Sequence, residues 1–141
     1  MLNSLVKINL LARAGLAFVF LYHGLVPKIL WLSTIERELV ALHNPGIPAD
    51  ILSPVAGVME ILLALAIFFY RRSLLPVYAA AALLVVLLLD VALVKPALLA
   101  EAFNPVSINL VSLLLCYLVA STQRYLIQRG IHQEDVSVTS P

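Results

Sequence analysis

The chain has 141 residues, of which 62% are hydrophobic and only 12% are charged, with a formal net charge of +1. Soluble domains contain roughly 45–50% apolar and roughly 25% charged residues, so a soluble fold of this length could not bury so much apolar surface. With a net charge of only +1, the chain lacks the dense Lys and Arg face that phosphate binding requires, which argues against nucleic acid as a partner. The composition therefore predicts a small protein whose main partner is the lipid bilayer.

Four apolar segments are each about long enough to cross a bilayer as a helix. They cover residues 8–32, 51–70, 74–94 and 106–123. The first segment is long and has no suitably placed small-x-small cleavage site, so we interpret it as a retained helix and not a signal peptide. Gly24 and Pro27 predict a kink near its far end. The pattern predicts an all-α, polytopic transmembrane four-helix bundle.

The longest polar connection follows the first segment. Ser33 and Glu36 form a capping-box pattern, and apolar residues then recur at helical spacing, which predicts a short interfacial helix ending at residues 44–46. We expect Ser53 and Pro54 to open the second span, because proline is tolerated in a first helical turn. Residues 1–130 are predicted to form one transmembrane domain, and residues 131–141 a polar, disordered tail.

Basic residues predict the orientation of the bundle. One side carries Lys7, Arg71, Arg72, Arg124 and Arg129, whereas the basic residues of the other side are diluted by glutamates. The positive-inside rule then places both termini in the cytoplasm.

The candidate functional residues are polar groups within or near the apolar segments. They are Arg13, His23, Lys28, Glu60, Asp90 and Asn109. Ionisable side chains in a bilayer are costly and often mark ligand or proton paths. One hypothesis therefore places all of them except Arg13 in a polar pocket that opens outward.

A second hypothesis gives these charges a purely structural role. Arg13 would pair with Glu60, and Lys28 or Lys95 would pair with Asp90, so that the pairs hold the helices in register. A third possibility is contact with partner helices. Glu60 is the hardest to explain by packing alone, because a carboxylate near mid-bilayer must be paired, protonated or in contact with water.

The sequence contains few signals for cofactors. Cys116 is the only cysteine, which excludes an internal disulfide or a CxxC pair and predicts a small packing residue. The three histidines are scattered, and no metal, haem or iron–sulfur signature is present. A quinone is a candidate ligand, and the sequence assigns no reaction.

Several short motifs resemble one family of membrane proteins. They are Arg13-Ala14-Gly15, the LYHGLVPK run at 21–28, the AGVMEILL run at 56–63, and Phe103-Asn104-Pro105 followed by Asn109. Together they are similar to the DoxX-like family of small four-helix membrane proteins, in its YHGLVPK-type branch. The resemblance implies a bacterial inner membrane location and relatives with redox roles. One relative is similar to the small subunit of a thiosulfate:quinone oxidoreductase, and another joins an oxidative-stress membrane complex.

The motif residues that carry over are Arg13, His23, Gly24, Lys28, Gly57 and Glu60, and the resemblance assigns a role to none of them. The single cysteine departs from related redox bundles that use cysteine pairs.

Three functions follow from these observations. The first is an accessory subunit that binds a small lipophilic or anionic ligand, with a quinone as one candidate, for a redox partner protein. The second is a structural or assembly protein whose buried charges only fix helix packing. The third, a small-solute transporter, is weaker, because four helices could serve only as a homo-oligomer and no inverted repeat is apparent.

Overall fold

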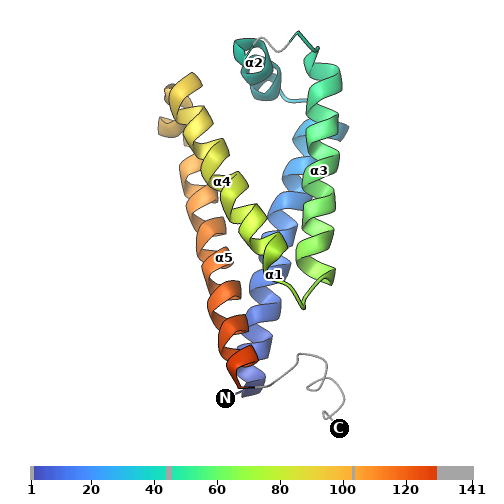
Figure 1. Ribbon diagram of the computed structural model, residues 1–141. Helices are drawn as coiled ribbons and strands as arrows, with labels where there is room; N and C mark the ends of the chain where they lie inside the picture. The colour runs from blue at the N-terminus through green and yellow to red at the C-terminus, as the bar shows by residue number, and fades with distance from the viewer. Residues whose placement is uncertain (1, 44–45, 103, 130–141) are drawn as a thin grey trace.

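The computed structural model describes residues 2–43, 46–102 and 104–129, in which every regular element is a helix. Four long helices run alternately up and down, and a short helix lies across one end of them (Figure 1). The long helices are α1 (Leu2–Leu25, continued by the π-helical turn η1, Val26–Leu30), α3 (Ala49–Phe69), α4 (Leu75–Val94) and α5 (Pro105–Gln128). The short elements are α2 (Thr34–His43) and the 3-10 turn η2 (Pro96–Ala100). The predicted four-helix bundle with a short helix in its first loop is confirmed.

The bundle has two chemically different ends. The start of α1, the α3–α4 turn and the end of α5 lie together and are called the amino-terminal end (Figure 1). The opposite end, covered by α2, is called the α2 end. The predicted tail at 131–141, and Asn44 and Pro45 at the predicted end of the short helix, lie outside the described residues.

The helix ends follow local chemistry. At Pro27 the α-helix changes to a π-helical turn, in which Trp31 N donates to Val26 O at 2.9 Å. Asn104 caps α5 by accepting a hydrogen bond from Ser107 N at 3.0 Å. The capping pattern before α2 is also present, since Glu36 N donates to Ser33 Oγ at 3.2 Å.

Two expected helix starts were placed too late. The first membrane helix begins at Leu2 instead of residue 8, because a helix can continue through polar residues beyond the apolar segment. The second begins at Ala49, where Asp50 in the first turn favours the positive end of the helix dipole. Pro54 therefore lies inside α3 and does not open it.

The tightly packed core fills the amino-terminal half of the bundle. Its largest members lie on facing sides of all four long helices: Leu16, Phe20, Ile67, Val77, Leu84 and Val119. Cys116 belongs to this core with 4% of its surface exposed, as predicted for a packing residue. Toward the α2 end, α3 and α4 diverge from their short turn (Figure 1).

The outer surface of the four long helices is apolar. Large side chains such as Leu11, Phe69 and Leu93 are 71%, 72% and 84% exposed, which would be costly in water. Each of the four helices, α1 together with η1, is long and apolar enough to cross a bilayer. The chain is therefore a multi-pass membrane protein, with its exposed apolar side chains in contact with lipid.

Candidate functional site

A pair of glycines brings α1 and α3 into close contact. A Cβ atom built on Gly24 would lie 2.5 Å from the carbonyl oxygen of Gly57 and 3.0 Å from Glu60 Cβ. A Cβ atom on Gly57 would similarly meet the Gly24 carbonyl oxygen and lie 3.0 Å from Lys28 Cβ. Only residues without a side chain allow the two backbones to approach this closely. The crossing therefore places Lys28 and Glu60, each about one turn further along, against each other.

Lys28 and Glu60 form the central ion pair of the site. Lys28 Nζ donates to Glu60 Oε1 at 2.6 Å and also lies 3.7 Å from Glu36 Oε1 on α2. The side chains of Lys28 and Glu60 are 12% and 9% exposed, so the pair is largely removed from solvent. A charge-assisted hydrogen bond of this length is strong and directional, which holds both groups in place.

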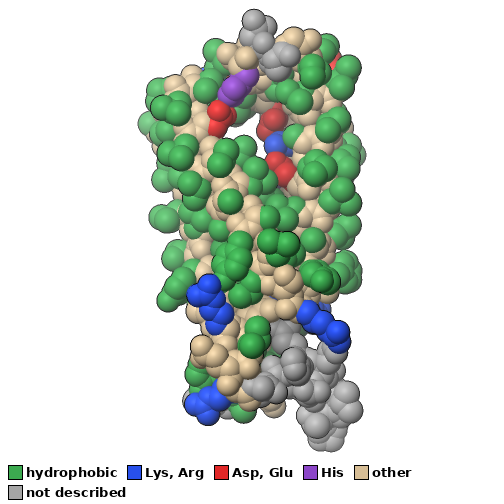
Figure 2. All heavy atoms as spheres, viewed as in Figure 1, with side chains coloured by type: hydrophobic (Ala, Val, Ile, Leu, Met, Phe, Trp, Pro, Cys, Tyr) green, Lys and Arg blue, Asp and Glu red, His purple; other side chains and the backbone are tan. Residues whose placement is uncertain are grey.

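This ion pair lies on the wall of a cavity of about 820 Å³, within the range of small-molecule sites. The wall is mostly apolar, with Phe20 from α1, Leu84, Leu87 and Val91 from α4, and Ile108 and Val111 from α5. Polar groups occupy a minority of it, and α2 contributes Ile35, Glu36 and Leu39 as a cover. Figure 2 shows the hollow in side view, below α2, with acidic and basic side chains inside it.

Four of the six predicted site residues line this cavity: His23, Lys28, Glu60 and Asn109. His23 is exposed at the cavity wall and contacts the Tyr22 ring edge-on, with 6.2 Å between ring centroids. Asn109 is 8% exposed, and within the described residues its side-chain amide makes no hydrogen bond. Three helices and the π-helical turn thus contribute polar groups to one apolar space.

The second carboxylate oxygen of Glu60 lacks a partner. Glu60 is 7% exposed, and Oε2 is buried with no hydrogen bond to any described residue. A buried acceptor without a donor costs about 1–3 kcal/mol, and more when it is charged. A water molecule or a ligand hydroxyl that donates to Oε2 would remove that cost.

The charges on the cavity wall are unequal. Among the described residues, the cavity lining contains Lys28 and three glutamates, Glu36, Glu60 and Glu101. Carboxylates therefore outnumber basic side chains on the wall. The cavity therefore favours ligands that donate hydrogen bonds over ligands that carry negative charge.

Asp90 lies outside this cavity and holds α2 against α4. Its carboxylate oxygen Oδ1 is 2.8 Å from His43 Nε2, and a second link joins Lys95 Nζ to Glu38 Oε2. The expected pairing of Lys28 or Lys95 with Asp90 is thus wrong. Lys95 pairs with Glu38 of α2, and Asp90 pairs with His43 of the same helix. Both residues therefore contact α2 and not each other.

Both ring nitrogens of His43 face acceptors, since Nδ1 lies 2.7 Å from Leu39 O and Nε2 faces Asp90. These contacts, the Leu39 carbonyl first and the Asp90 carboxylate second, raise the pKa of His43 above its usual 6.5. The doubly protonated ring can donate to both acceptors, so the link between α2 and α4 favours the imidazolium form.

Arg13 also lies outside the cavity, in a buried network at the amino-terminal end. Its Nη1 donates to Ile67 O at 2.8 Å, and Nη2 donates to Gln123 Oε1. Two further carbonyls of the α3–α4 turn accept from Nη2 at 3.4 Å, and Asn9 Oδ1 accepts from Nε at 3.2 Å. Arg13 is fully buried and satisfies carbonyls at the carboxyl end of α3, where a cation is favoured.

The expected pairing of Arg13 with Glu60 is therefore wrong as well, because Glu60 lies several turns away toward the α2 end and pairs with Lys28. Four residues that take part in these ion pairs and hydrogen-bond networks were not among the predicted site residues: Glu36, His43, Asn9 and Gln123. Glu36 and His43 were visible as charged or titratable residues of the predicted interfacial helix. Asn9 and Gln123 lie near the ends of apolar segments, where polar residues are common and give no signal.

The fold and the cavity define a class: a small multi-pass membrane protein with a mostly apolar cavity between its helices and a few charged side chains on the cavity wall. The sequence profile of the DoxX-like family matches residues 17–117, a region that includes the Lys28–Glu60 pair and most of the cavity wall. The chain belongs to the DoxX-like family. No curated protein and no solved structure matches it.

Proposed function

We propose that this protein binds a small lipophilic molecule in the cavity between α1, α4 and α5, as an accessory subunit for a redox partner. The observation that carries the proposal is Glu60, a buried carboxylate beside the cavity with one oxygen paired to Lys28 and the other without a donor. Replacing a buried ion pair by apolar side chains of similar volume is often neutral or stabilising, so stability of the bundle alone gives little reason for this pair.

The position of the cavity supports a ligand that enters from the bilayer. The cavity is overlain by α2, and its hollow is seen from the side of the bundle (Figure 2). The surrounding wall is apolar enough for a hydrocarbon tail, while Glu36 and Glu60 lie beside Lys28 as a charged group on it. An amphipathic molecule with one hydrogen-bonding head matches this division.

The charges favour the lipophilic ligand over the anionic one. An anion would meet the surplus of glutamates on the wall, whereas a neutral head avoids that repulsion. A quinone or quinol is a suitable candidate, because a quinone carbonyl can accept from Lys28 and, after reduction, a quinol hydroxyl can donate to Glu60 Oε2. Reduction of a quinone takes two electrons, which the redox partner would supply, and two protons, which Glu60 or His23 could pass to the ring oxygens.

The proposal includes an orientation in the bacterial inner membrane. The described basic residues at the amino-terminal end are Lys7, Arg13, Arg71, Arg72, Arg124 and Arg129. This excess supports placement of both termini in the cytoplasm, with the cavity toward the outer leaflet.

The direct test uses protein in nanodiscs and, under anaerobic conditions, the reduced quinol form of a ubiquinone with a decyl tail as the probe, because the quinol hydroxyl can donate to Glu60 Oε2. Trp31, which directly follows η1, is the only tryptophan and reports binding by fluorescence quenching. We expect Glu60→Gln to weaken binding about 10–100-fold, because a charged hydrogen bond contributes about 1.5–3 kcal/mol. Asp50→Asn is the matched control, since it removes a carboxylate at the α2 end that is in an exposed ion pair with Arg37 and does not line the cavity.

Binding that is unchanged in Glu60→Gln, with the bundle folded, would refute the cavity as the site. Leu87→Phe provides a second variant, which narrows the cavity without changing its charge or adding a second tryptophan, and it should also weaken binding. Native mass spectrometry of the protein from its own membrane then identifies any retained natural molecule.

The second candidate function is a structural or assembly protein without a ligand. The Arg13 network favours it, because this buried charge is fully used in joining α1, α5 and the α3–α4 turn. On that proposal, native mass spectrometry would find an empty bundle, and a co-purifying protein would identify the partner.

A further inference from the structure

We propose a second binding site, for an anionic phospholipid, in the groove between α4 and α5 near the amino-terminal end. The groove has a volume of about 330 Å³ and shares no lining residue with the cavity beneath α2. Its apolar part contains the small side chains Ala81 and Ala120, with Leu113 beside them. Small residues at these positions leave an open channel along the lipid-facing side of the two helices.

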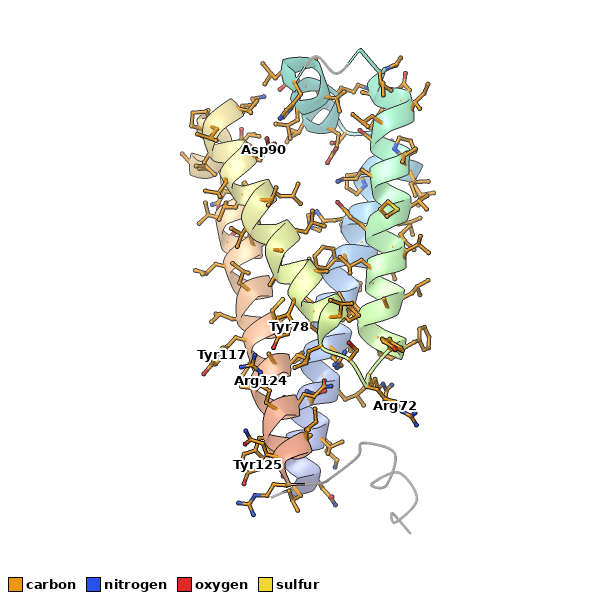
Figure 3. The ribbon with its side chains drawn as sticks, in the orientation of Figure 1. Arg72, Tyr78, Asp90, Tyr117, Arg124 and Tyr125 are labelled. Atoms are coloured by element: carbon orange, nitrogen blue, oxygen red, sulfur yellow. The ribbon has the colours of Figure 1, made fainter. Side chains whose placement is uncertain are left out.

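A cationic group lies at one end of the groove. Arg124 Nη2 donates to Tyr78 OH at 2.6 Å, and its guanidinium carbon is 5.8 Å from the centroid of the Tyr78 ring. Figure 3 shows Arg124, Tyr78 and Tyr117 at one level of α4 and α5. Within the described ranges no carboxylate pairs with Arg124, so donors of its guanidinium are available to an anion.

The charge of this end of the bundle is complementary to a phosphate. The carboxylates of the described residues are on α2 (Glu36 and Glu38), on α3 (Asp50 and Glu60), and on or after the last turns of α4 (Asp90 and Glu101). Figure 2 shows acidic side chains only in the half of the visible face that is nearer to α2. Arg71 lies in the α3–α4 turn, toward the same end of the bundle as Arg124, and adds positive potential. Basic groups at the membrane surface attract anionic headgroups.

The groove also explains why the occupant is a lipid and not a free anion. Tyr117 is 68% exposed on a membrane-spanning helix, so this surface faces acyl chains. An acyl chain can lie over Ala81 and Ala120 while its phosphate reaches Arg124 at the interface. Tyr78 and Tyr117, as amphipathic side chains, suit the boundary between those two parts.

The test measures lipids retained by the full chain in native mass spectrometry, from nanodiscs with equal amounts of phosphatidylglycerol and phosphatidylcholine. We expect the wild-type protein to retain phosphatidylglycerol in preference. Arg124→Gln should reduce that retention about fivefold, which corresponds to about 1 kcal/mol for one basic residue at an anionic surface. Arg129→Gln is the matched control, because Arg129 stacks on Tyr125 of the same helix at 5.3 Å but does not line the groove.

A second variant tests the contact with the acyl chain separately from the contact with the phosphate. Ala120→Phe fills the groove, keeps every charge and should lower phosphatidylglycerol retention as Arg124→Gln does. Equal losses in Arg124→Gln and Arg129→Gln would overturn the proposal, because they would show a diffuse surface effect. Displacement of the lipid by millimolar glycerol 3-phosphate would also overturn it, since a free anion would then suffice.

Discussion

Replacing Gly57 with alanine tests the helix crossing on which the Lys28–Glu60 pair depends. The added methyl group would meet the Gly24 carbonyl oxygen and lie 3.0 Å from Lys28 Cβ, so the two backbones must separate. Overpacking of this kind costs about 1–3 kcal/mol, and the better helix propensity of alanine offsets up to about 1 kcal/mol of that. We expect a net loss of about 1–2 kcal/mol.

Gly15→Ala is the matched control on α1. Its new Cβ would lie 3.4 Å from Leu115 Cδ1, an ordinary contact with a flexible side chain. The same substitution there should be neutral or slightly stabilising, because the propensity gain is not opposed by a clash. The difference between the two variants therefore isolates the close approach of α1 and α3.

The measurement is unfolding in mixed micelles titrated with sodium dodecyl sulfate, followed by circular dichroism. Gly24→Ala and Gly57→Ala should be non-additive when combined, because both methyl groups force apart the same pair of backbones. Equal stabilities of Gly57→Ala and Gly15→Ala would refute the reasoning. A stable Gly57→Ala variant that still bound the decyl ubiquinol at wild-type strength would show that the crossing does not set the site.

Three further predictions concern the charged groups. Arg13→Met should reduce the free energy of unfolding by about 2–4 kcal/mol in the same micelle assay, since several buried acceptors lose a charged donor. The His43–Asp90 link should be fully formed below about pH 6.5 and lost as the pH rises through the raised pKa of His43, seen as a fall in the amide-exchange protection factors of α2. The double variant Lys28→Met with Glu60→Leu should be at least as stable as either single variant, because neither charge is left unpaired.

Each of these predictions has its own control. Arg129→Met removes an exposed arginine at the same end as Arg13 and should change stability by less than about 0.5 kcal/mol. In His43→Gln the protection factors of α2 should stay constant over this pH range, and a fall that persisted would assign the titration to another group. If the double variant at Lys28 and Glu60 were less stable than both single variants, the expectation would be wrong. The attraction between the two charges would then exceed the cost of removing them from solvent.

Much of the fold was predictable from the sequence because each helix carries its own signal. The four apolar segments, Pro105 after an N-cap asparagine, and the Ser33 cap before a short helix all act within a few residues of the chain. Helix ends were less predictable, as Leu2 and Ala49 show, because polar residues near a membrane surface are compatible with either a helix or a loop. The depth of Glu60 in the bundle followed directly from counting along α3.

The pairing of the charges was decided by the tertiary structure. Hydropathy and helical spacing give the depth of Arg13, Lys28, Glu60 and Asp90, but many rotations of the four helices would be compatible with those depths. The Gly24–Gly57 crossing fixes the rotation of α1 against α3 and so selects Glu60 for Lys28. By itself the sequence determined a membrane bundle with costly charges inside, because the composition has more apolar surface than a soluble fold of this length could bury. Which charges meet depended on contacts between helices far apart in the chain, and only packing sets those contacts.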